Sequence, residues 1–298
     1  MSKEKEKTNI VKRILGSPIS VPYIALILVF IISTIASPDI FPTYSNVMNI
    51  LRQASIVGVV SIGMTIVLLV GGIDLSVTSV MAITACLLAD MMEKGVNAGK
   101  TGIMLGPVIL VLLLGSLIGL INGIIVVTRR LEAFIVTLAM NMIVKGIVMV
   151  YTKGAPGGKV TEFWEYFGSG FVFGIPCAVV LYAVMMAIFI VVLYKTVYGR
   201  HIYAIGSNAE AARLTGIKVK SNKILAYVIC GFTAALGGIM LMARVRVGEP
   251  NGSTGYDMDA LAAAVIGGTA MSGGVGTLAG TLAGVIIMAM VNNILNLV

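Results

Sequence analysis

Charged residues, histidine and paired cysteines are all scarce in this chain. Only 11% of its 298 residues are charged, against roughly 25% in an ordinary soluble domain. The single histidine, His201, cannot form a cluster, and Cys86, Cys177 and Cys230 fall in apolar runs without the spacing of a metal site or a disulfide framework. We therefore expect no bound metal and no fold held together by disulfide bonds.

Catalytic constellations are missing as well. The segment 95–101, GVNAGKT, is one residue short of a P-loop, and 274–279, GVGTLA, matches a dinucleotide pattern only inside an apolar segment, where small residues indicate helix packing. The sequence shows no Ser/His/Asp or Cys/His arrangement. We therefore predict that the chain is not an enzyme and binds no nucleotide cofactor of its own.

Apolar residues are abundant. They make up 58% of the chain, and the mean hydropathy is +1.02. Apolar runs of membrane-spanning length recur, which predicts an all-α, polytopic transmembrane bundle embedded in a lipid bilayer, with one transmembrane domain over 19–298. The predicted spans lie near 19–36, 47–70, 72–92, 103–127, 131–151, 176–194, 224–243, 258–276 and 277–298.

The distribution of positive charge orients these spans. A basic segment at 1–18 precedes the first span, and the loop 195–223 carries six further Lys and Arg residues. With the N-terminus inside, thirteen Lys and Arg residues lie in inner segments and six in outer ones, as the positive-inside rule requires. We predict a cytoplasmic N-terminus and a cytoplasmic loop at 195–223, and the net charge of +8 then reflects the membrane rather than a nucleic-acid partner.

Glycine pairs interrupt the apolar pattern twice, at 70–76 (VGGIDLS) and at 266–272 (IGGTAMS). Paired, interrupted hydrophobic segments are typical of transporters. The count of spans makes the two copies parallel, whereas an inverted relation requires a re-entrant piece within 244–276. Both arrangements of 244–276 remain open from the sequence.

The residues around these breaks are candidates for a translocation pathway. Asp74 stands in an apolar environment, where a carboxylate is costly and often functional. Alternatively, Gly71 and Gly72 break a helix and Asp74 caps the next one. The second copy has Ala270 at this place, which argues against a symmetric ion site. The candidate pathway residues are Gly71, Gly72, Asp74, Ser76, Gly267, Gly268 and Ser272.

A short helix is predicted inside the basic loop. Asn208 or Ser207 can cap its start, and Gly216 can end it. Such a helix is either a docking element for a partner or an ordinary solvated loop helix. The candidate docking residues are Asn208, Glu210, Ala211, Ala212, Arg213 and Gly216.

These motifs together carry a resemblance. The E-A-A-x3-G pattern at 210–216 resembles the coupling motif of bacterial ABC-importer permeases. The longer string GRHIYAIGSNAEAARLTGIKV is similar to the coupling region of the carbohydrate-uptake permeases that move ribose, galactose and similar sugars. GGIDLSV at 71–77 and LAAAVIGGTAMSGGVGTLAGTLAGV at 261–285 resemble two other segments of that family, so the similarity runs from about Asn46 to the end.

The resemblance implies a permease subunit of an ATP-driven monosaccharide importer in the bacterial inner membrane. It implies ten helices, of which nine are visible here, and a homodimer. The expected partners are a cytoplasmic ABC ATPase, often a fused double module that binds ATP and magnesium, and an extracytoplasmic solute-binding protein.

Two departures and several alternatives accompany the resemblance. Thr78 stands where the family usually has glycine, and the chain stops at Val298 within an apolar run, which we interpret as a missing final segment. The cargo could instead be a nucleoside, a polyol or a sugar-like signalling molecule. Other readings are an ATP-independent secondary transporter, or a scaffold or channel subunit whose loop helix docks a different partner.

Overall fold

The structure is a computed structural model that describes residues 20–99, 101–129 and 131–297. The predicted basic segment 1–18 lies outside the described residues. The described part contains twelve helices and one two-stranded hairpin. In chain order the elements are α2 Ser20–Ala36, α3 Tyr44–Leu69, α4 Val77–Asn97, α5 Leu105–Arg129, α6 Ala133–Thr152, α7 Glu162–Ser169, β1 Phe171–Val172, β2 Ile175–Pro176, α8 Cys177–Lys195, α9 Val197–Ser207, α10 Ala209–Leu214, α11 Val219–Val245, α12 Tyr256–Ile266 and α13 Leu278–Leu297.

The prediction of an all-α polytopic bundle is confirmed. Six described helices are long and apolar enough to cross a membrane, namely α3, α5, α6, α8, α11 and α13. Eight of the nine predicted spans each coincide with one helix. The prediction of a continuous span over 258–276 is wrong, because α12 has 11 residues and ends at Ile266. The chain then passes through a glycine-rich loop before α13 begins.

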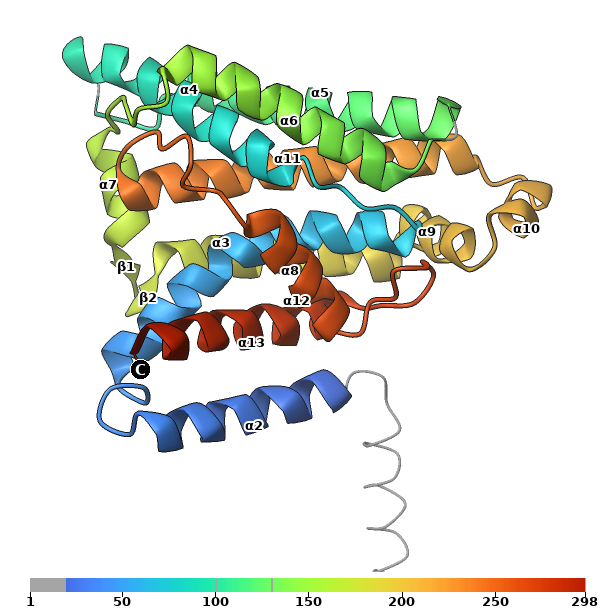
Figure 1. The fold of residues 1–298 in the computed structure, drawn as a ribbon, viewed down its shortest axis with the longest axis horizontal. Helices are drawn as coiled ribbons and strands as arrows, with labels where there is room; N and C mark the ends of the chain where they lie inside the picture. The colour runs from blue at the N-terminus through green and yellow to red at the C-terminus, as the bar shows by residue number, and fades with distance from the viewer. Residues whose placement is uncertain (1–19, 100, 130, 298) are drawn as a thin grey trace, which may run out of the picture.

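Helix α11 lies at the centre of the bundle and packs against α3, α4 and α5 (Figure 1). The contact with α5 is close because Gly115 and Gly119 of α5 face the backbone of Gly231 and Tyr227. A side chain at either α5 glycine would overlap that backbone. The small-xxx-small pattern at Gly115 and Gly119 is therefore a helix-packing face.

The two ends of the bundle carry different elements (Figure 1). One end carries α7 and the β1–β2 hairpin, and we call it the hairpin end. The opposite end carries α9 and α10, and we call it the docking end. Antiparallel pairing of Phe171 with Pro176 forms the hairpin.

Two helices begin inside the bundle after non-helical segments. The segment 70–76 leads from the docking end to the start of α4, and the segment 246–255 leads from the hairpin end to the start of α12 (Figure 1). The two helix starts meet: the Ser253 hydroxyl donates to the Thr78 carbonyl at 2.9 Å, and the Asp257 N–H donates to Thr78 Oγ1 at 3.2 Å. The arrangement is the re-entrant one, and it relates α3–α4 to α11–α12 as inverted units. Each of the two glycine motifs follows a helix that runs to the docking end and precedes a helix that runs away from it (Figure 1).

Candidate functional site

Helix α10 projects from the docking end of the bundle (Figure 1). Asn208 caps it, because Asn208 Oδ1 accepts a hydrogen bond from the Ala211 N–H at 2.9 Å. An Asn cap satisfies a backbone donor that no intrahelical carbonyl can reach. Of the two predicted caps, the structure selects Asn208; the Ser207 hydroxyl instead donates to the Tyr203 carbonyl.

The surface of α10 is largely free of contacts with the rest of the described chain. Arg213 donates to Glu210 at 2.6 Å, and this hydrogen bond holds the pKa of the exposed Glu210 carboxyl below its usual value. Ala212 is buried, whereas the apolar side chain of Leu214 is 74% exposed. An exposed leucine beside an ordered ion pair gives the helix both an apolar and a polar contact for a partner.

Gly216 ends the α10 turn in the left-handed conformation, with φ +86°. No atom lies within 4 Å of the place where its Cβ would stand. The requirement for glycine is therefore conformational rather than steric. The six docking residues predicted from the sequence are all together in this one element and its flanks.

Helix α9 connects α10 to the interior through a contact between glycines. A Cβ on Gly206 would overlap the Leu69 carbonyl and the Gly274 N–H, which bond to each other at 2.9 Å. A Cβ on Gly273 would lie 2.9 Å from the Gly71 nitrogen and 3.1 Å from Gly206 Cα. We call these four residues, Gly71, Gly206, Gly273 and Gly274, the glycine contact. It joins α9 to both glycine-rich loops.

Tyr203 adds a hydrogen bond to the same region. Its hydroxyl donates to the Gly276 carbonyl at 2.9 Å, one turn before the end of α9. These contacts connect α9, which directly precedes α10, to the loops at 70–76 and 267–277. The sequence reasoning missed Tyr203, Gly206, Gly273 and Gly274, although the Gly-Gly pair at 273–274 was a visible signal.

The seven candidate pathway residues divide into two groups. Gly71, Gly268 and Ser272 are exposed at the loop surfaces, and the Ser272 carbonyl lies 3.3 Å from the Cβ position of Gly71. Gly72 packs on the Tyr227 hydroxyl, and Gly267 packs on the backbone of Gly280. The two loops therefore meet.

Asp74 and Ser76 lie deeper, each 1% exposed. Asp74 Oδ1 accepts from the Ser76 N–H at 3.0 Å and from the Ser76 hydroxyl at 2.6 Å. Asn122 of α5 donates to Ser76 Oγ at 2.8 Å. These bonds shape the turn that precedes α4, whose N-cap is Ser76 and has no side-chain capping hydrogen bond. Asp74 therefore fixes the turn before the helix rather than capping it, and Asp74 Oδ2 has no hydrogen-bond partner among the described residues.

Thr78 stands where the family usually has glycine, and its side chain makes a hydrogen bond that accounts for this difference. Its hydroxyl accepts the Asp257 N–H in the first turn of α12, where backbone donors lack intrahelical partners. A glycine could not supply this bond. The threonine thus ties the start of α12 to α4.

Lys145, which lies in the apolar helix α6, has hydrogen-bond partners. Lys145 Nζ donates to the Pro250 carbonyl at 2.6 Å and to Asn251 Oδ1 at 3.0 Å. Both acceptors belong to the re-entrant segment 246–255. Lys145 of α6 therefore fastens that segment rather than extending toward a membrane surface.

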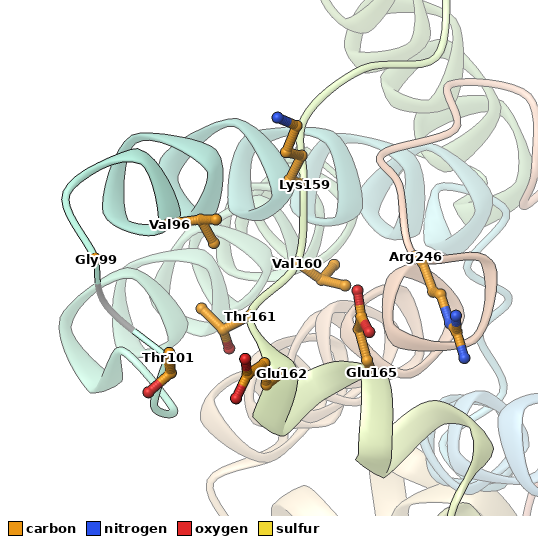
Figure 2. Close-up of a pocket in the computed structure, with 9 residues that line it drawn as sticks. All are labelled: Val96, Gly99, Thr101, Lys159, Val160, Thr161, Glu162, Glu165 and Arg246. Carbon is orange, nitrogen blue, oxygen red and sulfur yellow. The ribbon is translucent and has the colours of Figure 1, made fainter.

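The hairpin end carries a charged pocket of about 280 Å³ between the end of α4, α7 and the end of α11 (Figure 2). Glu162 and Glu165 come from the first turn of α7, Arg246 follows α11, and Lys159 precedes α7. Mixed charge at the rim of a pocket suits a polar protein–protein contact. No group of three or more His, Cys, Asp or Glu side chains that could hold a metal ion occurs among the described residues.

Comparison with known proteins shows that the chain is similar to transport proteins. The family described as "Branched-chain amino acid transport system / permease component" matches residues 46–298. The ribose import permease protein RbsC of Escherichia coli K12 is 41% identical over 276 residues, which cover 91% of this chain and 84% of the relative.

Two further relatives carry other sugar names. The fructose import permease protein FruF of Bifidobacterium longum is 34% identical over 96% of this chain and 83% of its own length. The L-arabinose ABC transporter permease protein AraH of Azospirillum brasilense is 32% identical over 91% of this chain and 78% of its own length. No solved structure matches the chain.

Proposed function

The chain belongs to the family of branched-chain amino acid transport system permease components, and we propose from this premise that it is the membrane subunit of an ATP-driven importer of a monosaccharide. It is a membrane-embedded transporter subunit rather than a catalytic one. The sugar cargo is inferred from relatives named for ribose, arabinose and fructose import. The broader family description names branched-chain amino acids, so the cargo requires a direct test.

The observation that best supports the mechanism is the chain of contacts at the docking end. Helix α10 is exposed, α9 carries it, and Gly206 of α9 touches both Leu69 and Gly274. A partner that moves α10 would thereby move the loops that precede α4 and α13. A ligand or partner shifts a conformational equilibrium only through different contacts in the two states, and α10 supplies such a contact.

We propose three protein partners. A cytoplasmic ABC ATPase, in which two modules are often fused, binds α10 and supplies ATP and magnesium, while this chain binds neither. A solute-binding protein docks on the charged hairpin end around Glu162, Glu165 and Arg246 (Figure 2). A second copy of this chain completes a homodimer, with the pathway between or beside the two copies.

The proposed orientation follows from these partners. The docking end, with its basic loop 195–223, faces the cytoplasm, and the hairpin end faces outward. The N-terminus is cytoplasmic and the membrane is the bacterial inner membrane. The excess of Lys and Arg in the predicted inner segments supports this orientation.

Affinity purification of the tagged chain from its native membrane tests the proposal. Mass spectrometry should recover an ABC ATPase and a secreted binding protein, and the ligand retained by that binding protein should be a monosaccharide. Recovery of an amino acid would refute the sugar cargo while leaving the importer intact. Recovery of the chain without an ATPase, in detergents that preserve complexes, would favour an ATP-independent transporter.

A further inference from the structure

A small polar cavity lies between α3, α11, α12 and α13, away from the glycine contact. Its volume is about 160 Å³, below the range of roughly 300–1,000 Å³ that is typical for drug-sized ligands. The cavity is therefore sized for a small solute. Its lining residues are Gln53, Val57, Arg244, Tyr256, Asp259, Met288, Ala289 and Asn292.

Four of the polar lining side chains have unused hydrogen-bonding capacity. Within the described part of the chain, Gln53, Arg244, Asp259 and Asn292 donate or accept no side-chain hydrogen bond, and the three ion pairs lie elsewhere. All four are only partly exposed. Polar groups in a membrane protein that leave their capacity unused usually face water or a polar solute.

The chemistry of the lining selects a class of solute. Arg244 and Asp259 carry opposite charges, so the cavity has no net charge and favours a neutral ligand. The Asp259 carboxylate accepts from hydroxyl groups, the Arg244 guanidinium donates to them, and the two amides do both. Tyr256 adds an aromatic surface for C–H groups.

We propose that this cavity is a transient binding site for a neutral polyhydroxylated solute, the monosaccharide cargo, on its way through the permease. The inference rests on the proposed function and gives the cargo a location within this chain. This binding site lies apart from the seven candidate pathway residues at the glycine motifs.

Helix α12 connects the cavity to the docking end. Tyr256 and Asp259 stand in its first turn, and Gly267, directly after its last residue, opens the loop that reaches the glycine contact. Eleven residues span about 16 Å in an α-helix. A movement of this loop would displace the whole short helix, and with it the side of the cavity that Tyr256 and Asp259 line.

Protection of an introduced cysteine by sugar tests the site. In a version of the full chain with Cys86, Cys177 and Cys230 replaced by alanine, the Asn292→Cys variant is assembled with its ATPase in nanodiscs. It is then reacted with neutral hydroxyethyl methanethiosulfonate while D-ribose is titrated. The Asn296→Cys variant is the matched control, since Asn296 lies one turn away on the same helix but outside the cavity.

Saturating D-ribose should slow labelling of the Asn292→Cys variant about tenfold by mass action and leave the Asn296→Cys variant unchanged. Adding Asp259→Asn should raise the ribose concentration needed for protection roughly tenfold, because a charged hydrogen bond is lost. The Asp257→Asn variant is its control, since Asp257 lies on the same helix but does not line the cavity. If Asn292→Cys does not assemble, Gln53→Cys gives the same readout from the facing helix.

The outcomes separate the two proposals. If the complex transports ribose but ribose protects neither position, the cavity is not a sugar site and the importer function stands. If L-leucine protects and ribose does not, the polyhydroxylated class is wrong. If the complex transports no sugar from the ribose, arabinose and fructose set, the proposed function itself fails.

Discussion

Removal of the Asn208 cap should weaken the attachment of the ATPase without unfolding the permease. Asn208 Oδ1 accepts the Ala211 N–H at 2.9 Å, and the helix it starts has six residues. Isolated helices of this length are marginal in water. The loss of an Asn cap costs about 1 kcal/mol, so Asn208→Ala should lower the equilibrium constant for ordering of α10 about fivefold.

The effect on binding follows from this equilibrium. If only ordered α10 binds, the apparent Kd for the ATPase rises up to about fivefold per permease copy. A homodimer that uses both helices would then show a change of up to roughly 25-fold. Biolayer interferometry between nanodisc-embedded permease and purified ATPase measures this directly.

The chain offers a matched control and a rescue. Asn222 is half-buried and lies in the first turn of α11, close to α10 in the chain, but its side chain donates to the Lys218 carbonyl and accepts no capping hydrogen bond. Asn222→Ala should leave the Kd unchanged, and Asn208→Asp should restore most of the lost affinity because aspartate also caps. Equal affinities of the Asn208→Ala and Asn222→Ala variants would refute the reasoning.

Three further substitutions separate docking, transmission and pathway structure. Gly206→Val should abolish ATP-driven uptake, because the new side chain collides with Leu69 and Gly274. ATPase binding should be preserved. Normal uptake by this variant would contradict transmission through α9. Gly216→Ala should weaken ATPase binding roughly 5- to 30-fold, since a left-handed alanine costs about 1–2 kcal/mol. Gly216→Asn should cause a smaller loss of binding. Equal losses in the two variants would contradict the conformational explanation. Asp74→Ala should lower the free energy of unfolding of the detergent-solubilised protein by about 1 kcal/mol, because the hydrogen bonds that Asp74 Oδ1 accepts from Ser76 are lost. Asp74→Asn should keep this stability, because the amide oxygen can still accept from Ser76. Loss of uptake in both variants at full stability would show that the charge itself is required.

Most of the fold was predictable from the sequence because membrane spans are long, apolar and bounded by charge. Eight of nine predicted spans coincide with helices. The exception, 258–276, is largely apolar, with Asp259 as its one charged residue, and hydropathy alone cannot distinguish a spanning helix from a short helix followed by a glycine-rich loop. The glycines at 267, 268, 273 and 274 were the signal that decides this point.

The docking helix was also predictable, since capping residues and a terminal glycine are local features. The same holds for the resemblance to sugar-uptake permeases, which the relatives confirm. The glycine contact and the polar cavity were not predictable, because each assembles residues from distant helices. Gln53 and Asn292, for example, are far apart in the chain, and only the packing of α3 against α13 brings them to one cavity.

Uptake into proteoliposomes tests the central claim most directly. The permease is reconstituted with its ATPase, its binding protein is added outside, and labelled D-ribose, D-fructose, L-arabinose or L-leucine is supplied with or without ATP inside. We predict accumulation of at least one of the three sugars that requires both ATP and the binding protein. Accumulation of leucine alone, or sugar entry that is independent of ATP, would contradict the account.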